Sequence, residues 1–506
     1  MQAIQARFKF LFQSTKGLIL VAIAVIALVT AIWGMLSGPM AELGVREVVV
    51  DAVGFDMDPV EREGRLVILY HSIAMAVIAI LVYMITGLIP MKEHEKVTIN
   101  ASVTLGYMTT MFFGMAFAYF GHNWAFHGVY LLGLSIMFFT GIMLAKALWP
   151  WRKEYRNTDP AYAHLRGVNL ERLALFVMAV ATLGSALFGA IAGANYGNGF
   201  TTFLAEDTIR WPDKTDLQFA IVGHLHIMLA LMAVAMALIV GRWFNWKGLL
   251  HKISMPIMIV GTMIMTAGTW AVVPMHGGAA HMIIYAGSTF VLLAGLFLVI
   301  FGFSKIIRER LAEQGIEKAS FGQGVKALLH DPLKFGMLWQ MVYMNFCTSF
   351  IGIFVAVRLD EIFRIWPWRD ERLILTGHWH ILSGIIATII LLYYADMAGL
   401  KGKVRQWFGW SVIIGSDVAF GAVTIFELKR LFVSELNQQP VTDVTMLLAD
   451  IGLALVLVVL AALMVWRLVD LFKERGRWHE ELEETGYEAA AAEKREGLIS
   501  AQELAK

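Results

Sequence analysis

Cysteine and charge are both scarce in this sequence. The 506-residue chain has one cysteine, Cys347, so it has no internal disulfide and cannot hold a zinc or iron–sulfur cluster on several thiolates. Without a CxxCH motif, covalent attachment of a c-type heme to this chain is excluded. Charged residues make up 16% of the chain and hydrophobic residues 58%, and the net charge of +1 suggests no nucleic-acid partner. This composition predicts a membrane protein.

Long apolar runs recur along nearly the whole chain. Each has roughly 20 residues, which is enough for a helix to cross a hydrocarbon core of about 30 Å. We therefore expect an all-α integral membrane protein with about twelve transmembrane helices. The expected spans begin near Gly17, Leu66, Ile99, Ala125, Leu170, Leu217, Ile253, His281, Gly336, Leu373, Trp407 and Met446.

The loops between these runs predict the orientation of the chain. Alternate loops are rich in Lys and Arg, as cytoplasmic loops are, whereas "LAEDTIRWPDKTD" after the fifth span is more acidic. Both termini are therefore expected in the cytoplasm. Residues 1–472 form the membrane domain, and residues 473–506 form a charged cytoplasmic tail that we expect to be a solvated helix or a flexible end.

Histidines gather near the expected outer face. This layer contains nine of the fourteen in the chain: His71, His122, His127, His224, His226, His276, His281, His378 and His380. A single histidine here is more often a hydrogen-bonded packing residue. A layer of them indicates ligands, because neutral imidazole binds metals and heme iron and helical bundles hold cofactors on facing helices. With no thiolate set, heme is the natural candidate.

Two of these histidines stand one residue apart in "LILTGHWHILSG". Residues i and i+2 of an α-helix point about 200° apart, so His378 and His380 face opposite sides of the tenth span. They cannot comfortably share one small metal ion. They can each bind a different heme, one on either side of the helix.

The chain resembles the catalytic subunit of the heme-copper oxidase superfamily, and most closely its nitric oxide reductase branch. The resemblance rests on the twelve expected spans, on "GHWH", on "LYHSIAMAVIAILVYMITGLIP" in the second span and on "VGHLHIM" in the sixth. It implies that His71 and His380 are the axial ligands of a low-spin heme and that His378 binds a second heme. It also implies that Lys429 and Arg430 in "FELKRLF" pair with heme propionates. The hemes are expected to be b-type.

The family's second metal site is degenerate here. Family members with reductase chemistry hold copper or non-heme iron with one histidine of the sixth span and a tandem pair in the seventh, and the tandem pair is missing. Met228 stands where the family has a tyrosine or a glutamate. In one interpretation His224, with His276 or His281 and His226, still binds a metal. In the other, one of these histidines is the second axial ligand of the second heme; Met228 favours this version.

The resemblance implies a respiratory subunit of a bacterial or archaeal inner membrane. It would pass electrons through two hemes, between a quinol or cytochrome c and a partner, with a c-type cytochrome subunit on its outer face and membrane lipid around it. Two alternatives stay open: an enzyme that reduces nitric oxide or oxygen, and a twelve-helix transporter. Asp417, the clearest charge near the midplane, could serve a proton path or bond a neighbouring helix.

Overall fold

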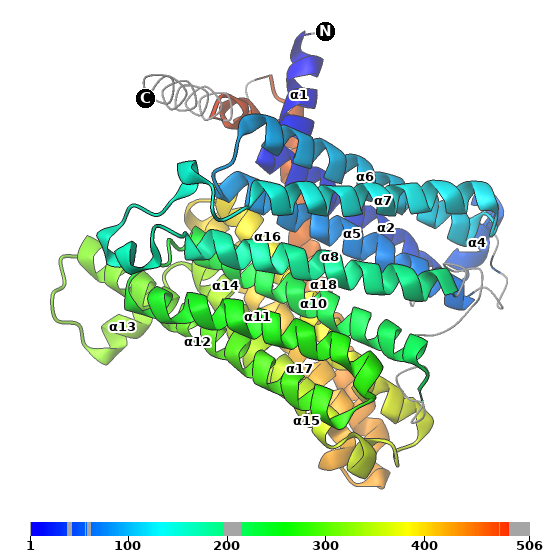
Figure 1. Ribbon diagram of the computed structural model, residues 1–506. Coiled ribbons are helices and arrows are strands. Elements are labelled where there is room, and N and C mark those ends of the chain that lie inside the picture. The colour runs from blue at the N-terminus through cyan, green and yellow to red at the C-terminus, as the bar shows by residue number, and fades with distance from the viewer. Residues whose placement is uncertain are drawn as a thin grey trace. The chain divides into compact units, whose positions relative to one another are not determined.

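All regular elements in the described part of the chain are helical. The computed structural model describes residues 2–37, 43–55, 57, 62–195, 214–474 and 476–484, and its elements in that part of the chain are α-helices joined by short 3-10 and π segments (Figure 1). Twelve helices in the described ranges are long and apolar enough to cross a membrane. The prediction of an all-α, twelve-helix, multi-pass membrane protein is confirmed.

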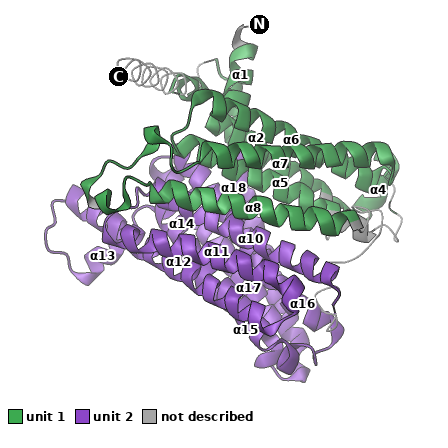
Figure 2. Ribbon diagram, in the orientation of Figure 1, with its two compact units in different colours: residues 1–204, 466–506 green, residues 205–465 purple. Residues whose placement is uncertain are grey.

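The chain divides into two compact units, each with its own packed helices (Figure 2). Unit 1 comprises residues 1–204 and 466–506, and unit 2 comprises residues 205–465. The helices of unit 1 are α1 (Gln2–Gln13), α2 (Thr15–Ser37), α4 (Val45–Val53), α5 (Arg62–Leu88), α6 (Glu93–Tyr119), α7 (Trp124–Ala147) and α8 (Leu170–Asn195).

Unit 1 is held together by close helix packing and by ion pairs at its loops. Gly133 of α7 brings that helix against α6, since a Cβ there would lie 2.6 Å from the backbone nitrogen of Thr110. Beyond the end of α7, Arg152 makes two hydrogen bonds to the Glu95 carboxylate, at 2.6 and 2.7 Å. This carboxylate raises the pKa of the Arg152 guanidinium, so the pair stays ionised.

Unit 2 contains the histidine pair and most of the longer helices. Its elements are α10 (Asp216–Trp243), α11 (Leu249–Met275), α12 (Gly278–Glu313), α13 (Phe321–Leu328), α14 (Pro332–Val342), the π segment η5 (Tyr343–Ser349), α15 (Phe350–Val357), the π segment η6 (Leu359–Phe363), α16 (Trp368–Met397), α17 (Gly402–Leu428), the 3-10 segments η7 (Lys429–Leu431) and η8 (Glu435–Asn437), and α18 (Gln438–Phe472), which continues into unit 1.

Local sequence explains where the helices of unit 2 begin. Thr215 and Gln218 form a capping box at the start of α10, with bonds of 3.4 and 2.9 Å between side chains and backbone. Asp331 caps α14 and Pro332 follows it, the order expected at a helix N-terminus. α16 begins at Trp368, with Asp370 and Glu371 in its first turn. The histidine pair therefore lies well inside α16, not at its first residues as a span beginning near Leu373 predicts.

The described part of the C-terminal tail is more buried than its sequence predicts. Trp478 is 1% exposed and Glu481 is 5% exposed, and the Glu481 carboxylate lies 2.6 Å from the buried Arg467 guanidinium of α18. This part of the tail is helical, as one of the two expectations has it, and Glu480 and Glu484 on it are exposed. Trp478 and Glu481, however, are packed within unit 1. The tail from residue 485 onward lies outside the described residues.

Candidate functional site

The two histidines of α16 are held in the same local way. The Nδ1 atom of His378 lies 3.3 Å from the carbonyl oxygen of Ile374, and that of His380 lies 2.9 Å from the carbonyl oxygen of Thr376. A carbonyl oxygen only accepts hydrogen bonds, so Nδ1 carries the proton in both bonds. The neutral ring then keeps its lone pair on Nε2, which is the state of a metal-ligating histidine.

The two rings have different surroundings, as their spacing predicts. His378 is half-buried and faces Gly352 of α15, where a Cβ would lie 3.1 Å from the Cδ2 atom of the imidazole. His380 is exposed. Gly352 leaves room for the His378 ring because it has no side chain.

A third histidine of this kind lies on α10. The Nδ1 atom of His226 is 2.8 Å from the carbonyl oxygen of Val222, so this ring also presents Nε2. It packs edge-on against Trp379, with centroids 4.8 Å apart, and the His378 ring packs on the same indole at 5.7 Å. The structure thus brings His226 and His378 together around Trp379. Of the two histidines in the sixth span, His226 makes these contacts, so it is the candidate to act with His378 as a second ligand.

The predicted metal set is not gathered in one place. His276 adopts a left-handed conformation (φ 49°) at the end of α11, and its Nε2 atom lies 2.5 Å from Asp216 at an exposed position. His281 is exposed and stacks on Tyr285. His224 is half-buried on α10. Among the residues that the structure describes, no three His, Cys, Asp or Glu side chains could hold a metal ion together.

His71 is a half-buried residue of α5 in unit 1, whereas His380 belongs to unit 2. Each is described within its own unit, so the heme expected between them stays a prediction. His71 is followed by Ser72, which is fully buried. The α5 helix near His71 contributes Ile68 to an apolar cluster that includes Phe117 and Tyr130.

Lys429 and Arg430, the expected propionate partners, share one carboxylate. The Lys429 Nζ atom lies 3.6 Å from one oxygen of Asp370, and the Arg430 Nε atom lies 2.5 Å from the other. Lys429 is only 6% exposed. Asp370, in the first turn of α16, therefore fixes both cations beside the helix that carries the histidine pair.

Glu427 is a candidate that the sequence analysis missed. It is 4% exposed, and neither of its carboxylate oxygens has a hydrogen-bond partner among the described residues. Its Oε1 atom occupies the space above Gly377, where a Cβ would lie 1.6 Å away. The carboxylate therefore sits against the backbone of α16 one residue before His378. Glu427 is visible in the sequence as the glutamate of "FELKRLF", two positions before Lys429. Its burial could not be predicted because it depends on Gly377, a glycine fifty positions earlier in the chain.

Asp417 takes part in helix-to-helix hydrogen bonds. Its carboxylate accepts from Trp339 Nε1 at 2.7 Å and from Gln340 Nε2 at 3.1 Å, both on α14. Of the two roles left open for it, bonding to a neighbouring helix is confirmed by these contacts.

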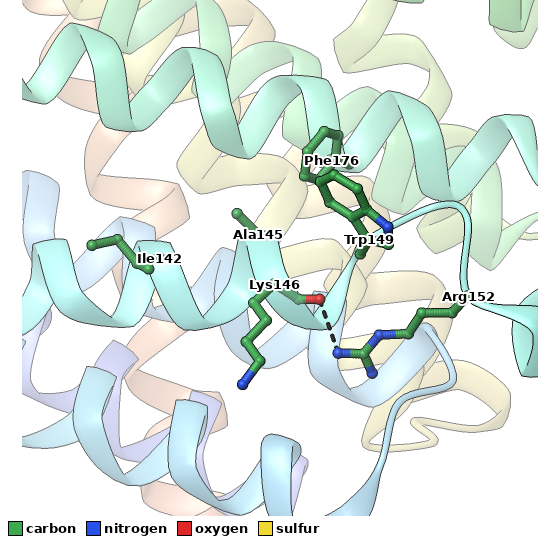
Figure 3. Close-up of a pocket in the computed structure, with 6 residues that line it drawn as sticks. All are labelled: Ile142, Ala145, Lys146, Trp149, Arg152 and Phe176. Carbon is green, nitrogen blue, oxygen red and sulfur yellow. Dashed lines mark hydrogen bonds between the residues drawn. The ribbon is translucent and has the colours of Figure 1, made fainter.

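A separate open groove of about 490 Å³ lies in unit 1, at the end of α7 (Figure 3). Its lining is mostly apolar, from Ile142, Ala145, Trp149 and Phe176, with Lys146 and Arg152 at the rim. Arg152 donates to the carbonyl oxygen of Lys146 at 3.0 Å as well as to Glu95. Of the two cations at the rim, the Arg152 guanidinium is thus already paired with the Glu95 carboxylate.

Lys214 lies just before α10 and has a lowered pKa. Burial and repulsion from Arg364 lower the pKa of its ammonium from 10.5 to about 8. The carboxylates of Asp360 and Glu371 act in the opposite direction but are outweighed. We expect acetylation of Lys214 by acetic anhydride to reach half its maximal rate near pH 8, measured by mass spectrometry of peptides. The same shift makes the folded state gain stability as pH rises from 8 towards 10.5, because the unfolded chain binds the proton more tightly there. A midpoint for Lys214 near the ordinary lysine value of 10.5 would contradict this prediction.

Comparison of the chain with protein-family models, with characterised proteins and with solved structures gives no match. What the chain does is therefore inferred from the geometry of its own residues and from the sequence resemblance.

Proposed function

We propose that this chain is a membrane electron-transfer subunit that carries two hemes, each ligated by one histidine of α16. The proposal rests on one hydrogen bond that His378, His380 and His226 all make, from Nδ1 to the backbone carbonyl four residues earlier. In each, Nδ1 donates a hydrogen bond to a backbone carbonyl, which is the tautomer that makes Nε2 the ligand atom of the ring. Bound heme iron would supply reversible one-electron storage.

Four histidines would form two pairs of axial heme ligands. His380 and His71 would hold one heme, as the resemblance implies. His378 and His226 would hold the other, because both rings pack on Trp379. Lys429 and Arg430, fixed by Asp370, would offset the negative charge of propionates.

The subunit would lie in a bacterial or archaeal inner membrane and exchange electrons with a c-type cytochrome on its outer face, with quinol as the other candidate donor. The segment "FRIWPWRDER" would supply a docking patch for it, with Trp366 and Trp368 beside Arg364, Arg369 and Arg372. Reduction of nitric oxide or oxygen needs an open heme face, which a His226 ligand would close.

Heme content and carbon monoxide binding test this function. We expect two b-type hemes per purified chain by pyridine hemochromogen assay, no stoichiometric copper or third iron by metal analysis, and no rapid carbon monoxide binding after reduction. Copper or a third iron, or rapid carbon monoxide binding, would favour the gas-reducing enzyme. A colourless chain would overturn the heme proposal and favour the transporter alternative.

A further inference from the structure

The open groove at the end of α7 lies where one membrane-spanning helix ends and the next begins. The span in α7 runs from Trp124 to Ala147. Ile142 and Ala145 of the groove lie in the last turns of this helix, and Phe176 lies in the second turn of α8. An α-helix rises 1.5 Å per residue, so the groove reaches about 8 Å from the end of the span towards the membrane interior. This is the level at which acyl chains meet phospholipid headgroups.

The loop that joins α7 to α8 is fixed by two arginines. The buried Arg172 of α8 donates to the carbonyl oxygen of Ala147, the last residue of α7. Its guanidinium also lies over the Tyr155 ring, 3.9 Å from the ring centroid. Arg152 is held by its two hydrogen bonds to the Glu95 carboxylate. Because these contacts order the loop within unit 1, the groove is formed before any ligand binds.

Aromatic rings form the apolar wall of the groove. Trp149 packs against Trp151 at 4.9 Å between ring centroids and edge-on against Phe176 at 5.3 Å. Both indoles are exposed, as is Ile142. Tryptophan is enriched at the boundary between hydrocarbon and headgroups, because its ring is apolar and its N–H is polar. The wall therefore suits a ligand with a hydrocarbon chain that ends in a polar group at this boundary.

Cations outnumber carboxylates in the segment that builds the groove. From residue 142 to residue 176 the sequence has six Lys or Arg and three Asp or Glu, a difference of +3. The described ion pairs beside the groove join Arg152 to Glu95 and Lys92 to Glu154. The ammonium of the exposed Lys146 belongs to neither pair. Figure 3 shows the Lys146 and Arg152 side chains extending to one side of the groove, away from the Phe176 ring.

We propose that this groove binds one anionic phospholipid. Its acyl chain lies against Ile142, Ala145 and Phe176, where hydrocarbon covers apolar surface. Its phosphate accepts a charge-assisted hydrogen bond from the Lys146 ammonium. The loop "WPWRKEYR" is one of the basic loops expected in the cytoplasm, and basic pockets on that side of a membrane recognise anionic headgroups. A zwitterionic phospholipid brings its own cation, so the same site binds it more weakly.

Photo-crosslinking of the purified full-length chain in detergent tests the site. The probe is phosphatidylglycerol with a diazirine on one acyl chain, and mass spectrometry of peptides locates the crosslinks. We expect crosslinks between residues 142 and 176 that unlabelled phosphatidylglycerol removes, and that equal amounts of phosphatidylcholine or glycerol phosphate leave in place. K146Q should lower their yield roughly fivefold, the effect of one lysine on an anionic lipid at a membrane surface. K146R keeps the cation and should keep the yield.

The matched control is K403Q, which removes an exposed lysine from another basic loop, in the first turn of α17 in unit 2. Its crosslinks in the groove should equal those of the wild type. Crosslinks elsewhere on the K146Q chain should stay unchanged, which separates loss of the site from a change in folding. Equal competition by phosphatidylcholine, removal by glycerol phosphate, or an unchanged yield in K146Q would overturn the proposal. The test involves no heme, so its outcome is independent of the proposed electron transfer.

Discussion

H380A is expected to lower the heme content from two to one per chain, with loss of a low-spin b-type absorption signal. The physical reason is that the Nε2 atom of His380 is the only ligand atom that this residue offers, since its Nδ1 atom bonds the Thr376 carbonyl. H71A is expected to give the same spectrum. Absorption spectra and hemochromogen assays of the purified variants measure both changes.

Binding of the second heme should depend on different residues from binding of the first. H378A is expected to remove it, and H226A to open one of its faces, so that the reduced variant binds carbon monoxide rapidly. H224A should leave the face closed, because the packing around Trp379 involves His226. Carbon monoxide binding by H224A instead of H226A would assign the ligand to the other histidine of "GHLH".

The matched control for these variants is H330A. The Nδ1 atom of His330 lies 2.6 Å from the carbonyl oxygen of Ala327, so it shares the local hydrogen bond of the candidate ligands. It lies outside the spans, next to the start of α14. Full heme content in H330A, together with loss in H380A, separates ligation from a general effect on folding. Full heme content in H380A and H71A would contradict the low-spin assignment.

E481A is expected to destabilise the chain by about 3–5 kcal/mol, the usual cost when one partner of a buried ion pair is removed. Arg467 is 1% exposed and Glu481 is 5% exposed, with 2.6 Å between nitrogen and oxygen. Removing the carboxylate leaves a buried guanidinium whose nearest remaining anion is Asp470, at 3.7 Å. Thermal unfolding in detergent, followed by circular dichroism, measures the loss.

The control for this prediction is E484A, one turn further along the tail. Glu484 is 67% exposed in its ion pair with Lys16 at 3.2 Å, and an exposed pair contributes at most about 1 kcal/mol. The double variant R467M/E481M should recover most of the stability, because two apolar side chains leave no buried charge. Equal losses in E481A and E484A would show that the tail is not packed as described.

The sequence predicted the spans well because apolar length is a local property. The start of α16 was placed too late because Asp370 and Glu371 lower the hydropathy of its first turn, although acidic residues suit a helix N-terminus. The histidine pair was found for the same local reason, since its spacing lies within one helix.

Other features of the candidate site could not be predicted because they depend on contacts between distant segments. Glu427 is buried only because Gly377 leaves space for its carboxylate. The choice of His226 over His224 depends on where Trp379 of α16 packs against α10. In the same way, Trp478 and Glu481 are buried although the tail around them alternates acidic and basic residues.

Gly377 also carries an evolutionary consequence. A Cβ at this position would lie 1.6 Å from Glu427 Oε1, so any other residue here must displace that carboxylate. Positions 377 and 427 are therefore expected to change together: a lineage that replaces the glycine should also shorten the glutamate, for example to alanine or serine. Lineages that keep the glutamate are expected to keep the glycine in front of the first histidine.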